Sequence, residues 1–334
     1  MNCLNRFGPK VHHGLFSLTM RILITGGFGF VGGRLAVHLA QAGHQIVLGT
    51  RHLTASPEWL PQAEVRKIEW NDEIALHRSC DNVDVIIHGA GMNAQDSATD
   101  PIGALAFNGL ASARLVAAAN HVKVKKFIYL STAHVYANPL IGNINEETCP
   151  RNLHPYATSH LAGEQAILSA SQYGSIQSIV LRLSNAFGTP VHENVNCWML
   201  VINDLCKQAV QSNKLTLQTS GVQERDFIGL VDLCFVIEKL IGHSRLQQTN
   251  LLNVGNGTSK PVLEISMLIQ ERCTEILGFT PDLIYRKSAV IEKPIKLNYS
   301  IDHLNALGIS HNNGINIEEI DNLLLFCRKT FSKY

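Results

Sequence analysis

The segment Thr25–Gly32 has the composition and spacing of a phosphate-binding turn. It reads Thr-Gly-Gly-Phe-Gly-Phe-Val-Gly and follows a short apolar run, Arg21–Thr25. Glycines let the backbone turn tightly and approach a pyrophosphate, which then lies on the free N–H groups of the next helix. Placed between a strand and a helix, this turn predicts a dinucleotide site; an ordinary glycine-rich turn is the alternative. The residues expected to contact the cofactor here are Gly26, Gly29, Phe30, Val31 and Gly32.

The residues after the second expected strand bear on the choice between NAD and NADP. NAD-specific folds usually place an acidic residue there, which binds the ribose 2′-hydroxyl. This chain has Thr50, Arg51 and His52, so no carboxylate is present to repel a 2′-phosphate. The guanidinium of Arg51 can bind such a phosphate in a bidentate manner. NADP is therefore favoured, with NAD as the alternative and a solvated Arg51 as the simpler interpretation.

Short apolar runs alternate with helical segments through the first half of the chain. Strands separated by helices of this length pair in parallel, with right-handed crossovers. The runs are apolar throughout rather than alternating, as expected when helices cover both faces of the sheet. The pattern predicts an α/β fold, a Rossmann-type doubly wound parallel sheet. The expected strands are Arg21–Thr25, Gln45–Thr50, Val65–Glu69, Val83–His88, Lys126–Ser131 and Ser178–Leu183, and the expected helices are Arg34–Ala42, Gly103–Asn120 and Tyr156–Ser171.

The regular alternation fades after about residue 185. Helices are expected over Asn196–Gln211, Val231–Gly242, Val262–Leu277 and Ile317–Lys329, with short strands at Leu215–Gln218 and Asn250–Val254. This predicts a smaller C-terminal α/β lobe that binds substrate. The expected organisation is a disordered leader over residues 1–19, an NAD(P)-binding domain over 20–185 and the substrate lobe over 186–334, interleaved with the domain in space.

Composition narrows the class of protein. Of 334 residues, 46% are hydrophobic and 16% charged, and the net charge is +1, so nothing marks a site for nucleic acid or an anionic membrane. No apolar run is expected to approach the ~18 residues that a membrane helix needs. The eight cysteines are scattered without metal-ligand spacing. They predict reduced core cysteines in a cytoplasmic protein with no metal site.

Several further segments match sequence motifs of a known protein family. They are Asp84–Gly91, Phe107–Asn108, Tyr129–Tyr136 and Pro155–Glu164, together with the G-x-x-G-x-x-G spacing of the glycine turn. From about Met20 to Gly308 the chain resembles the extended short-chain dehydrogenases/reductases, the NAD-dependent epimerase/dehydratase family. The resemblance implies a nicotinamide cofactor with Ala90 and Asn108 lying along it, and it leaves a homodimer open.

The same resemblance implies a catalytic set. Thr132 matches the catalytic Ser/Thr and Tyr156 the tyrosine of P-Y-x-x-S-K, but the lysine position holds His160. Residues i and i+4 share one helix face, so Tyr156 and His160 can both reach one cofactor. A cation lowers the tyrosine pKa from about 10, whereas a histidine, near 6.5, is mostly neutral. His160 is expected to bind the nicotinamide ribose while supporting a tyrosinate less well.

This departure leaves three alternatives: a working variant, an attenuated enzyme, or a cofactor-binding protein without catalysis. The retained Thr132 and Tyr156 favour an enzyme. Sugar-nucleotide dehydratases have an Asp-Glu pair just after the catalytic Thr, where this chain has Ala133 and His134. Elimination is therefore disfavoured, and the resemblance points to a 4-epimerase or a 4-keto reductase.

The resemblance also assigns substrate residues. Asn185 and Arg225 match an asparagine and an arginine that contact the diphosphate of a nucleotide-linked sugar; for Arg225, an ion pair with Asp226 is the simpler interpretation. The family's R-x-G-D element is missing, and Lys293 or Lys296 are the available substitutes. A reductase of a non-nucleotide alcohol or ketone is the alternative function.

Overall fold

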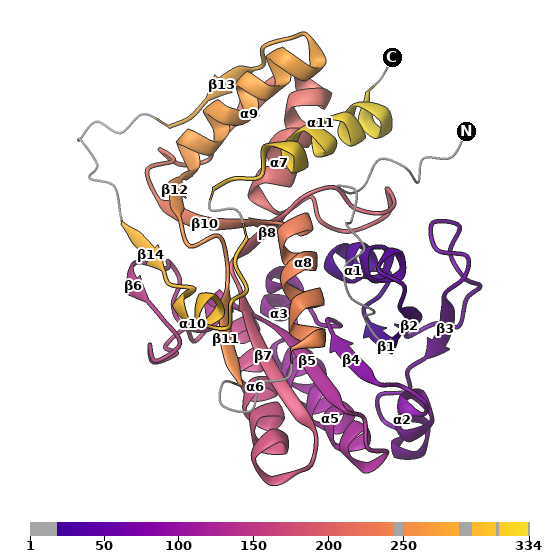
Figure 1. Cartoon of the computed structure of the whole chain (residues 1–334). Helices are drawn as coiled ribbons and strands as arrows, with labels where there is room; N and C mark the ends of the chain where they lie inside the picture. Colours follow the sequence, from indigo (N-terminus) through magenta and orange to yellow (C-terminus); the bar gives the residue numbers. More distant parts are fainter. Residues whose placement is uncertain (1–18, 244–249, 287–295, 312–313, 333–334) are drawn as a thin grey trace.

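The computed structural model describes residues 19–243, 250–286, 296–311 and 314–332. It has a large lobe around one parallel sheet and a smaller lobe beside it (Figure 1). Apart from Thr19, the leader expected over residues 1–19 lies outside the described residues. The seven strands of the sheet are, in spatial order, β11 (Leu251–Val254), β7 (Gln177–Leu183), β5 (Lys126–Thr132), β4 (Val85–His88), β1 (Arg21–Thr25), β2 (Gln45–Thr50) and β3 (Glu64–Lys67).

The strand order reverses next to β1. All six neighbouring pairs are parallel, and Thr25 at the end of β1 lies beside Gly49 of β2 and His88 of β4. The chain adds β2 and β3 on one side of β1, then crosses to add β4 and β5 on the other. In open α/β sheets, ligands bind at the carboxyl ends of the strands at such a switch point. The end of β1 is therefore the place to look for a site.

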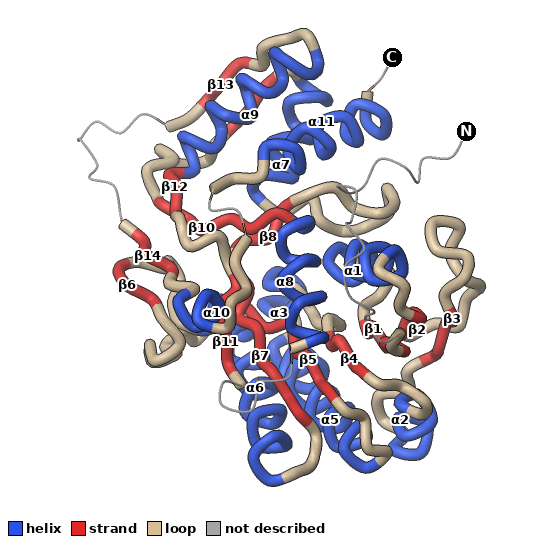
Figure 2. The backbone as a smooth tube through the Cα atoms, viewed as in Figure 1, coloured by secondary structure: helices blue, strands red, loops and turns tan. Residues whose placement is uncertain are grey.

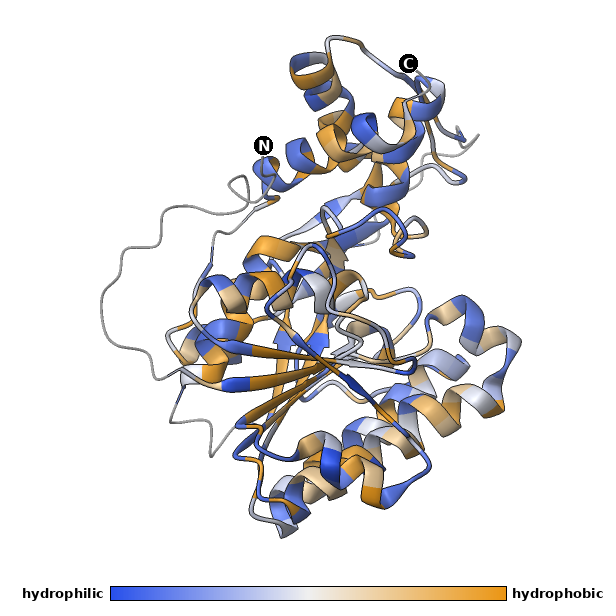
Figure 3. Cartoon of the chain, turned by 90° about the vertical axis from the view of Figure 1, so that its right-hand side faces the viewer, coloured by the Kyte–Doolittle hydropathy of each residue, from blue (hydrophilic) through white to orange (hydrophobic). Residues whose placement is uncertain are grey.

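Helices cover both faces of the sheet, which confirms the expected doubly wound α/β fold. Residues of α1 and α8 are buried in one apolar cluster with the strands, and residues of α2, α5 and α6 in another. Figure 3 shows the mostly apolar strands between the two helical layers. The helices are α1 (Phe30–Gln41), α2 (Glu73–Cys80), α3 (Ala94–Thr99), α5 (Ser112–His121), α6 (Pro155–Tyr173) and α8 (Leu230–Gly242).

Helix α1 begins at Phe30 rather than at the predicted Arg34. Gly32 and Gly33 have low helix propensity, so the sequence pattern alone favoured a later start. Tertiary contacts hold these glycines in the helix: a Cβ on Gly33 would lie 2.6 Å from the Val191 side chain. The glycine turn therefore leads directly into the helix N-terminus.

One helical stretch runs from Pro101 to His121. It comprises α4 (Pro101–Ala104), a π-helical segment η2 (Leu105–Ala111) and α5. By length and composition it is apolar enough to cross a membrane, which corrects the expectation that no segment approaches this length. Many of its apolar residues are alanines, and half of its apolar 18-residue window is buried inside the protein. π-Helical turns occur often at functional sites, and this one contains Asn108.

The smaller lobe is built mainly from the second half of the chain (Figure 2). After β10 the chain returns to the large sheet through α8 and β11. The predicted helix Asn196–Gln211 begins only at Val201, and α2 and β10 were not predicted. The remaining elements are β6 (Gly142–Ile144), β8 (Asn185–Phe187), α7 (Val201–Ser212), β9 (Lys214–Thr216), β10 (Glu224–Gly229), β12 (Ser259–Pro261), α9 (Val262–Leu277), β13 (Asp282–Ile284), β14 (Leu297–Tyr299), α10 (Asp302–Ala306) and α11 (Ile317–Phe331).

Candidate active site

The glycine turn lies at the switch point and has no room for side chains. Gly26 has a positive φ of 69°, and a Cβ there would lie 2.9 Å from the Gly89 carbonyl oxygen of the loop after β4. A Cβ on Gly32 would lie 2.3 Å from the Gly26 carbonyl oxygen. Gly29 is the N-cap of α1, no side chain caps this end, and Phe30 and Val31 form its first turn. Uncapped N–H groups and close backbone approach fit a dinucleotide pyrophosphate.

A hollow of about 370 Å³ lies beyond the ends of β2 and β3. Arg51, which is exposed after β2, lines it together with Glu69 and Trp70, which follow β3. The Trp70 ring is held edge-on to Phe107 at 5.2 Å. This position suits the adenosine half of a dinucleotide. The sequence interpretation included Arg51 but missed Glu69 and Trp70, although their place after a strand of the sheet was a usable signal.

The catalytic candidates meet at the end of β5. Thr132 is the last residue of β5, and its hydroxyl caps a 3₁₀ turn, η3 (Ala133–Val135), by accepting from the His134 N–H at 3.1 Å. The Thr132 side chain also lies close enough to the Tyr156 phenol to lower its pKa. Helix α6 begins beside it because Pro155 occupies the first turn and His154 Nδ1 accepts from the Tyr156 N–H at 3.2 Å. The fold thus brings Thr132 and Tyr156 together from distant parts of the chain.

His160 lies one helical turn beyond Tyr156, and the two rings meet edge-on with centroids 4.6 Å apart. Burial lowers the pKa of His160 to about 4. Burial raises the pKa of Tyr156, against a smaller opposite effect of the nearby Thr132 hydroxyl. Both groups are therefore neutral at pH 7, and no cation replaces the lysine charge at this position.

Ala90 lies in the loop after β4, and the Asn108 side chain bonds the same loop at Met92. The Ala90 N–H donates to Thr25 Oγ1 at 3.3 Å, which ties the loop after β4 to β1. Asn108 is fully buried; its Oδ1 accepts from the Met92 N–H at 2.7 Å and its Nδ2 donates to Ser159 Oγ at 3.0 Å. Its side chain is thus engaged within the protein, so we expect Asn108 to shape the loop along the cofactor rather than contact the cofactor itself.

Arg225 and Asp226 lie on β10 and do not form the ion pair that was the simpler interpretation. Successive residues of a strand point to opposite faces. Asp226 is buried and accepts from the backbone N–H groups of Asn256 and Gly257, each at 2.8 Å. Arg225 has no carboxylate partner among the described residues, and burial lowers its pKa. A half-buried guanidinium without a carboxylate suits an anionic ligand.

The other substrate candidates lie near Arg225 or outside the described residues. Asn185 of β8 donates to the Asp226 carbonyl oxygen at 2.8 Å, which places it beside β10. The pKa of His134 is lowered by burial and then by the nearby Arg225 and His154 charges, so these three basic groups are grouped around the end of β5. Lys296 pairs with Glu224 at 3.2 Å, and Lys293 lies outside the described residues.

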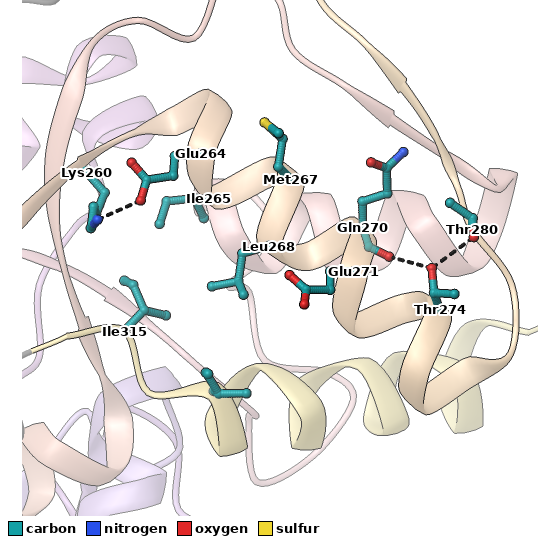
Figure 4. A pocket seen from close by; sticks show the side chains of 11 residues that line it. Lys260, Glu264, Ile265, Met267, Leu268, Gln270, Glu271, Thr274, Thr280 and Ile315 are labelled. Atoms are coloured by element: carbon teal, nitrogen blue, oxygen red, sulfur yellow. Dashed lines mark hydrogen bonds and ion pairs between the residues drawn. The ribbon is translucent and has the colours of Figure 1, made fainter.

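A larger cavity of about 570 Å³ lies in the smaller lobe between α9 and the start of α11 (Figure 4). Its lining includes Met267, Leu268 and Ile317 and none of the residues discussed above. We therefore place the candidate active site at the end of β5 and not in this cavity.

A glycine turn at the switch point, with a Thr–Tyr pair at the end of β5, defines a dinucleotide-binding protein of the short-chain dehydrogenase/reductase class. The chain belongs to the NAD dependent epimerase/dehydratase family, which it matches over residues 22–255. The resemblance inferred from the sequence motifs is confirmed.

Individual relatives are distant. The UDP-glucose 4-epimerase of Rhizobium leguminosarum bv. trifolii is 25% identical over 269 residues, covering 75% of this chain and 81% of that protein. The structure of Thermus thermophilus UDP-glucose 4-epimerase complexed with NAD has a TM-score of 0.75 at 21% identity, covering 93% of this chain and 100% of that one. MoeE5 in complex with UDP-glucose and NAD has a TM-score of 0.73 at 24% identity, with coverages of 93% and 100%. These structures share the fold described above.

Proposed function

We propose that this protein is a nicotinamide-dependent enzyme that transfers hydride at C4 of a nucleotide-linked sugar, as a 4-epimerase or a 4-keto reductase. The observation that carries the proposal is the Thr132–Tyr156 pair at the carboxyl end of β5, on the same edge of the sheet as the glycine turn. Relatives named as UDP-glucose 4-epimerases support the substrate class.

The roles follow from the placement of the side chains. Tyr156 takes the proton of the C4 hydroxyl as that carbon is oxidised and returns a proton when the ketone is reduced, while Thr132 hydrogen-bonds the same oxygen. The nicotinamide, when bound, accepts or supplies the hydride. His160 binds the nicotinamide ribose as a neutral group. Ala133 and His134 supply no carboxylate, so elimination is not expected.

The diphosphate would be held by Arg225, with Asn185 beside it. A ligand that binds only the native state raises the melting temperature, and the effect grows with the logarithm of its concentration above the dissociation constant. Saturating UDP is therefore expected to stabilise the protein, and GDP and dTDP serve as comparisons. No stabilisation by any of the three would favour the alternative, a reductase of a non-nucleotide alcohol or ketone.

The preference for NADP over NAD rests on Arg51 and on the absence of a carboxylate directly after β2. The two solved structures named above contain NAD, and Glu69 lines the same hollow as Arg51. If Arg51 binds a 2′-phosphate, Arg51→Ala weakens NADP binding and leaves NAD binding unchanged. Equal dissociation constants for NADP before and after the substitution would show that Arg51 does not bind a 2′-phosphate, and tighter binding of NAD than of NADP would assign the site to NAD.

One observation favours a second candidate function. His160 is buried and neutral, so a protein that binds the cofactor without turnover remains the alternative that this residue supports. It predicts a measurable cofactor dissociation constant together with no product from any nucleotide sugar.

We also propose a homodimer and a cytoplasmic location. The exposed side chains of Ile102, Leu105 and Leu110 lie on one helical stretch, which suits helix pairing between two copies. Light scattering after gel filtration tests the dimer. The seven described cysteines are all unpaired and six are buried, as suits a reducing compartment; cell fractionation tests the location.

A further inference from the structure

Tyr129 makes a contact with His160 that the mechanism above does not use. Tyr129 lies in β5, fully buried, and its hydroxyl is 2.9 Å from His160 Nδ1. Helix α6 can come this close because Gly163 has no side chain: a Cβ there would lie 2.8 Å from the Tyr129 hydroxyl and 2.6 Å from the Asn108 carbonyl oxygen. The phenol and the imidazole are therefore held together by the packing of α6 on β5.

The surrounding hydrogen bonds indicate the direction of this one. The Ser112 hydroxyl donates to the Asn108 carbonyl oxygen at 2.6 Å, so its oxygen accepts from His88 Nε2 at 2.8 Å. His88 Nδ1 then accepts from the Thr25 hydroxyl at 2.6 Å. A neutral imidazole has one donor and one acceptor nitrogen, so each of these assignments fixes the next.

Tyr129 is the last group in this series of hydrogen bonds. Burial raises the pKa of its phenol well above the usual value, so the proton stays on the oxygen. Its acceptors include the Asn108 carbonyl oxygen at 3.4 Å and His160 Nδ1 at 2.9 Å, while the nearby Ser112 oxygen already accepts from His88. The Nδ1 atom is the better placed acceptor. If it accepts, the proton of the neutral His160 is on Nε2.

The other edge of the His160 ring faces Gly91 in the loop after β4. A Cβ on Gly91, in the loop after β4, would lie 3.6 Å from His160 Cε1 and 3.7 Å from Nε2. Because Gly91 has no side chain, none from that position covers this edge. The Nε2–H group is thus presented toward the loop that follows the switch point.

We propose that Tyr129 is a positioning residue that fixes the Nε2–H tautomer of His160, so that a neutral oriented donor stands where the family has a cationic lysine. This inference rests on the proposed function only in assigning the nicotinamide ribose as the acceptor. A lysine has three rotatable donors and no tautomers, so its donation to the cofactor does not depend on a bond that selects one tautomer. Tyr129 should therefore matter for the cofactor only when residue 160 is histidine.

A double-mutant cycle tests this dependence. Tyr129→Phe removes the hydroxyl and keeps the ring. We expect it to weaken cofactor binding about fivefold in the parent, as the loss of one hydrogen bond implies, and to have no effect in the His160→Lys background. Tyr136→Phe is the matched control, because Tyr136 is an equally buried tyrosine whose hydroxyl bonds Asn253 instead. If Tyr129→Phe weakens cofactor binding by the same factor in both backgrounds, or in neither, the proposal is overturned.

A second measurement needs no variant. The ¹⁵N chemical shifts of the His160 ring in the unmodified protein should report Nε2–H, and an Nδ1–H tautomer would overturn the proposal. Cofactor affinity and tautomer do not depend on the substrate. Absence of turnover with nucleotide sugars would therefore contradict the proposed function and leave this test intact.

Discussion

The imidazole of His160 meets the phenol ring of Tyr156 edge-on, with centroids 4.6 Å apart and ring planes at 70°. A lysine at position 160 would bring a positive charge to the phenol. The buried imidazole, with its pKa lowered to about 4, brings none. Among the described residues, Thr132 alone therefore offsets the effect of burial on the pKa of Tyr156.

In the parent, activity is expected to rise with pH as Tyr156 ionises. His160→Lys is expected to shift this rise in activity to lower pH. A cation beside Tyr156 lowers the pKa of its phenol, so more tyrosinate is present at pH 7. If oxidation at C4 limits the rate, kcat at pH 7 should rise about tenfold, since each unit of pKa is a tenfold change in the ionised fraction. The measurement is kcat against pH.

His160→Gln is the control for this change, because glutamine donates a hydrogen bond without a charge. It should leave the pH profile where the parent has it. Identical profiles for all three proteins would show that charge at position 160 is not what limits Tyr156.

Local motifs were sufficient to find Thr132, Tyr156 and the glycine turn, because their chemistry depends on short spacings. Tyr129 could not be found in this way, since its contact with His160 depends on how closely α6 packs on β5 at Gly163. The orientation of Arg225 away from Asp226 needed the pleat of β10, a strand that the sequence pattern did not reveal. Trp70 and Glu69 needed the position of β3 beside β2.

Acid is expected to destabilise the protein through its buried histidines. The pKa of His160 is lowered from 6.5 to about 4 and that of His88 to about 3, mainly by burial, so the unfolded chain binds more protons between these values. Their contribution to stability is complete above pH 6.5 and is lost as the pH falls toward the folded values. For His160 this amounts to about 3 kcal/mol.

Urea unfolding of His160→Gln between pH 6.5 and about 4 measures this contribution. Between these pH values the free energy of unfolding should fall by about 3 kcal/mol less in the variant than in the parent. His52→Gln, at an exposed position, should match the parent. Asp226, whose pKa burial raises to about 6, acts with the opposite sign but equally in all three proteins. A pH dependence unchanged in His160→Gln would contradict the assigned burial of His160.

Arg225→Ala is expected to raise KM for a nucleotide sugar about 10- to 100-fold, because charge-assisted hydrogen bonds to the diphosphate are lost. The effect on kcat should be small, since the proposed role of Arg225 is to hold the diphosphate and not to act on C4. UDP should no longer raise the melting temperature of the Arg225→Ala variant. Arg286→Ala, at an exposed position, is the control. An unchanged KM would remove Arg225 from the substrate site.

Gly32→Ala is expected to abolish cofactor binding. The added Cβ would lie 2.3 Å from the Gly26 carbonyl oxygen. Neither residue can move away easily, because the turn fixes the backbone of both. Gly242→Ala places a Cβ where no atom lies within 4 Å and should bind the cofactor like the parent. Calorimetric titration with NAD and NADP measures both, and normal binding by Gly32→Ala would show that the cofactor is not held at this turn.

The central claim is that Tyr156 transfers a proton at a sugar C4 oxygen while hydride passes to the nicotinamide. The direct measurement is the near-ultraviolet absorbance of reduced nicotinamide after UDP-glucose or UDP-glucuronic acid is added to the protein with oxidised cofactor. Reduced cofactor should form with one of these sugars in the parent, and its rate of formation should fall at least 100-fold in Tyr156→Phe, the scale of general acid–base catalysis. Bound cofactor that is never reduced, or is reduced equally fast by Tyr156→Phe, would contradict the claim.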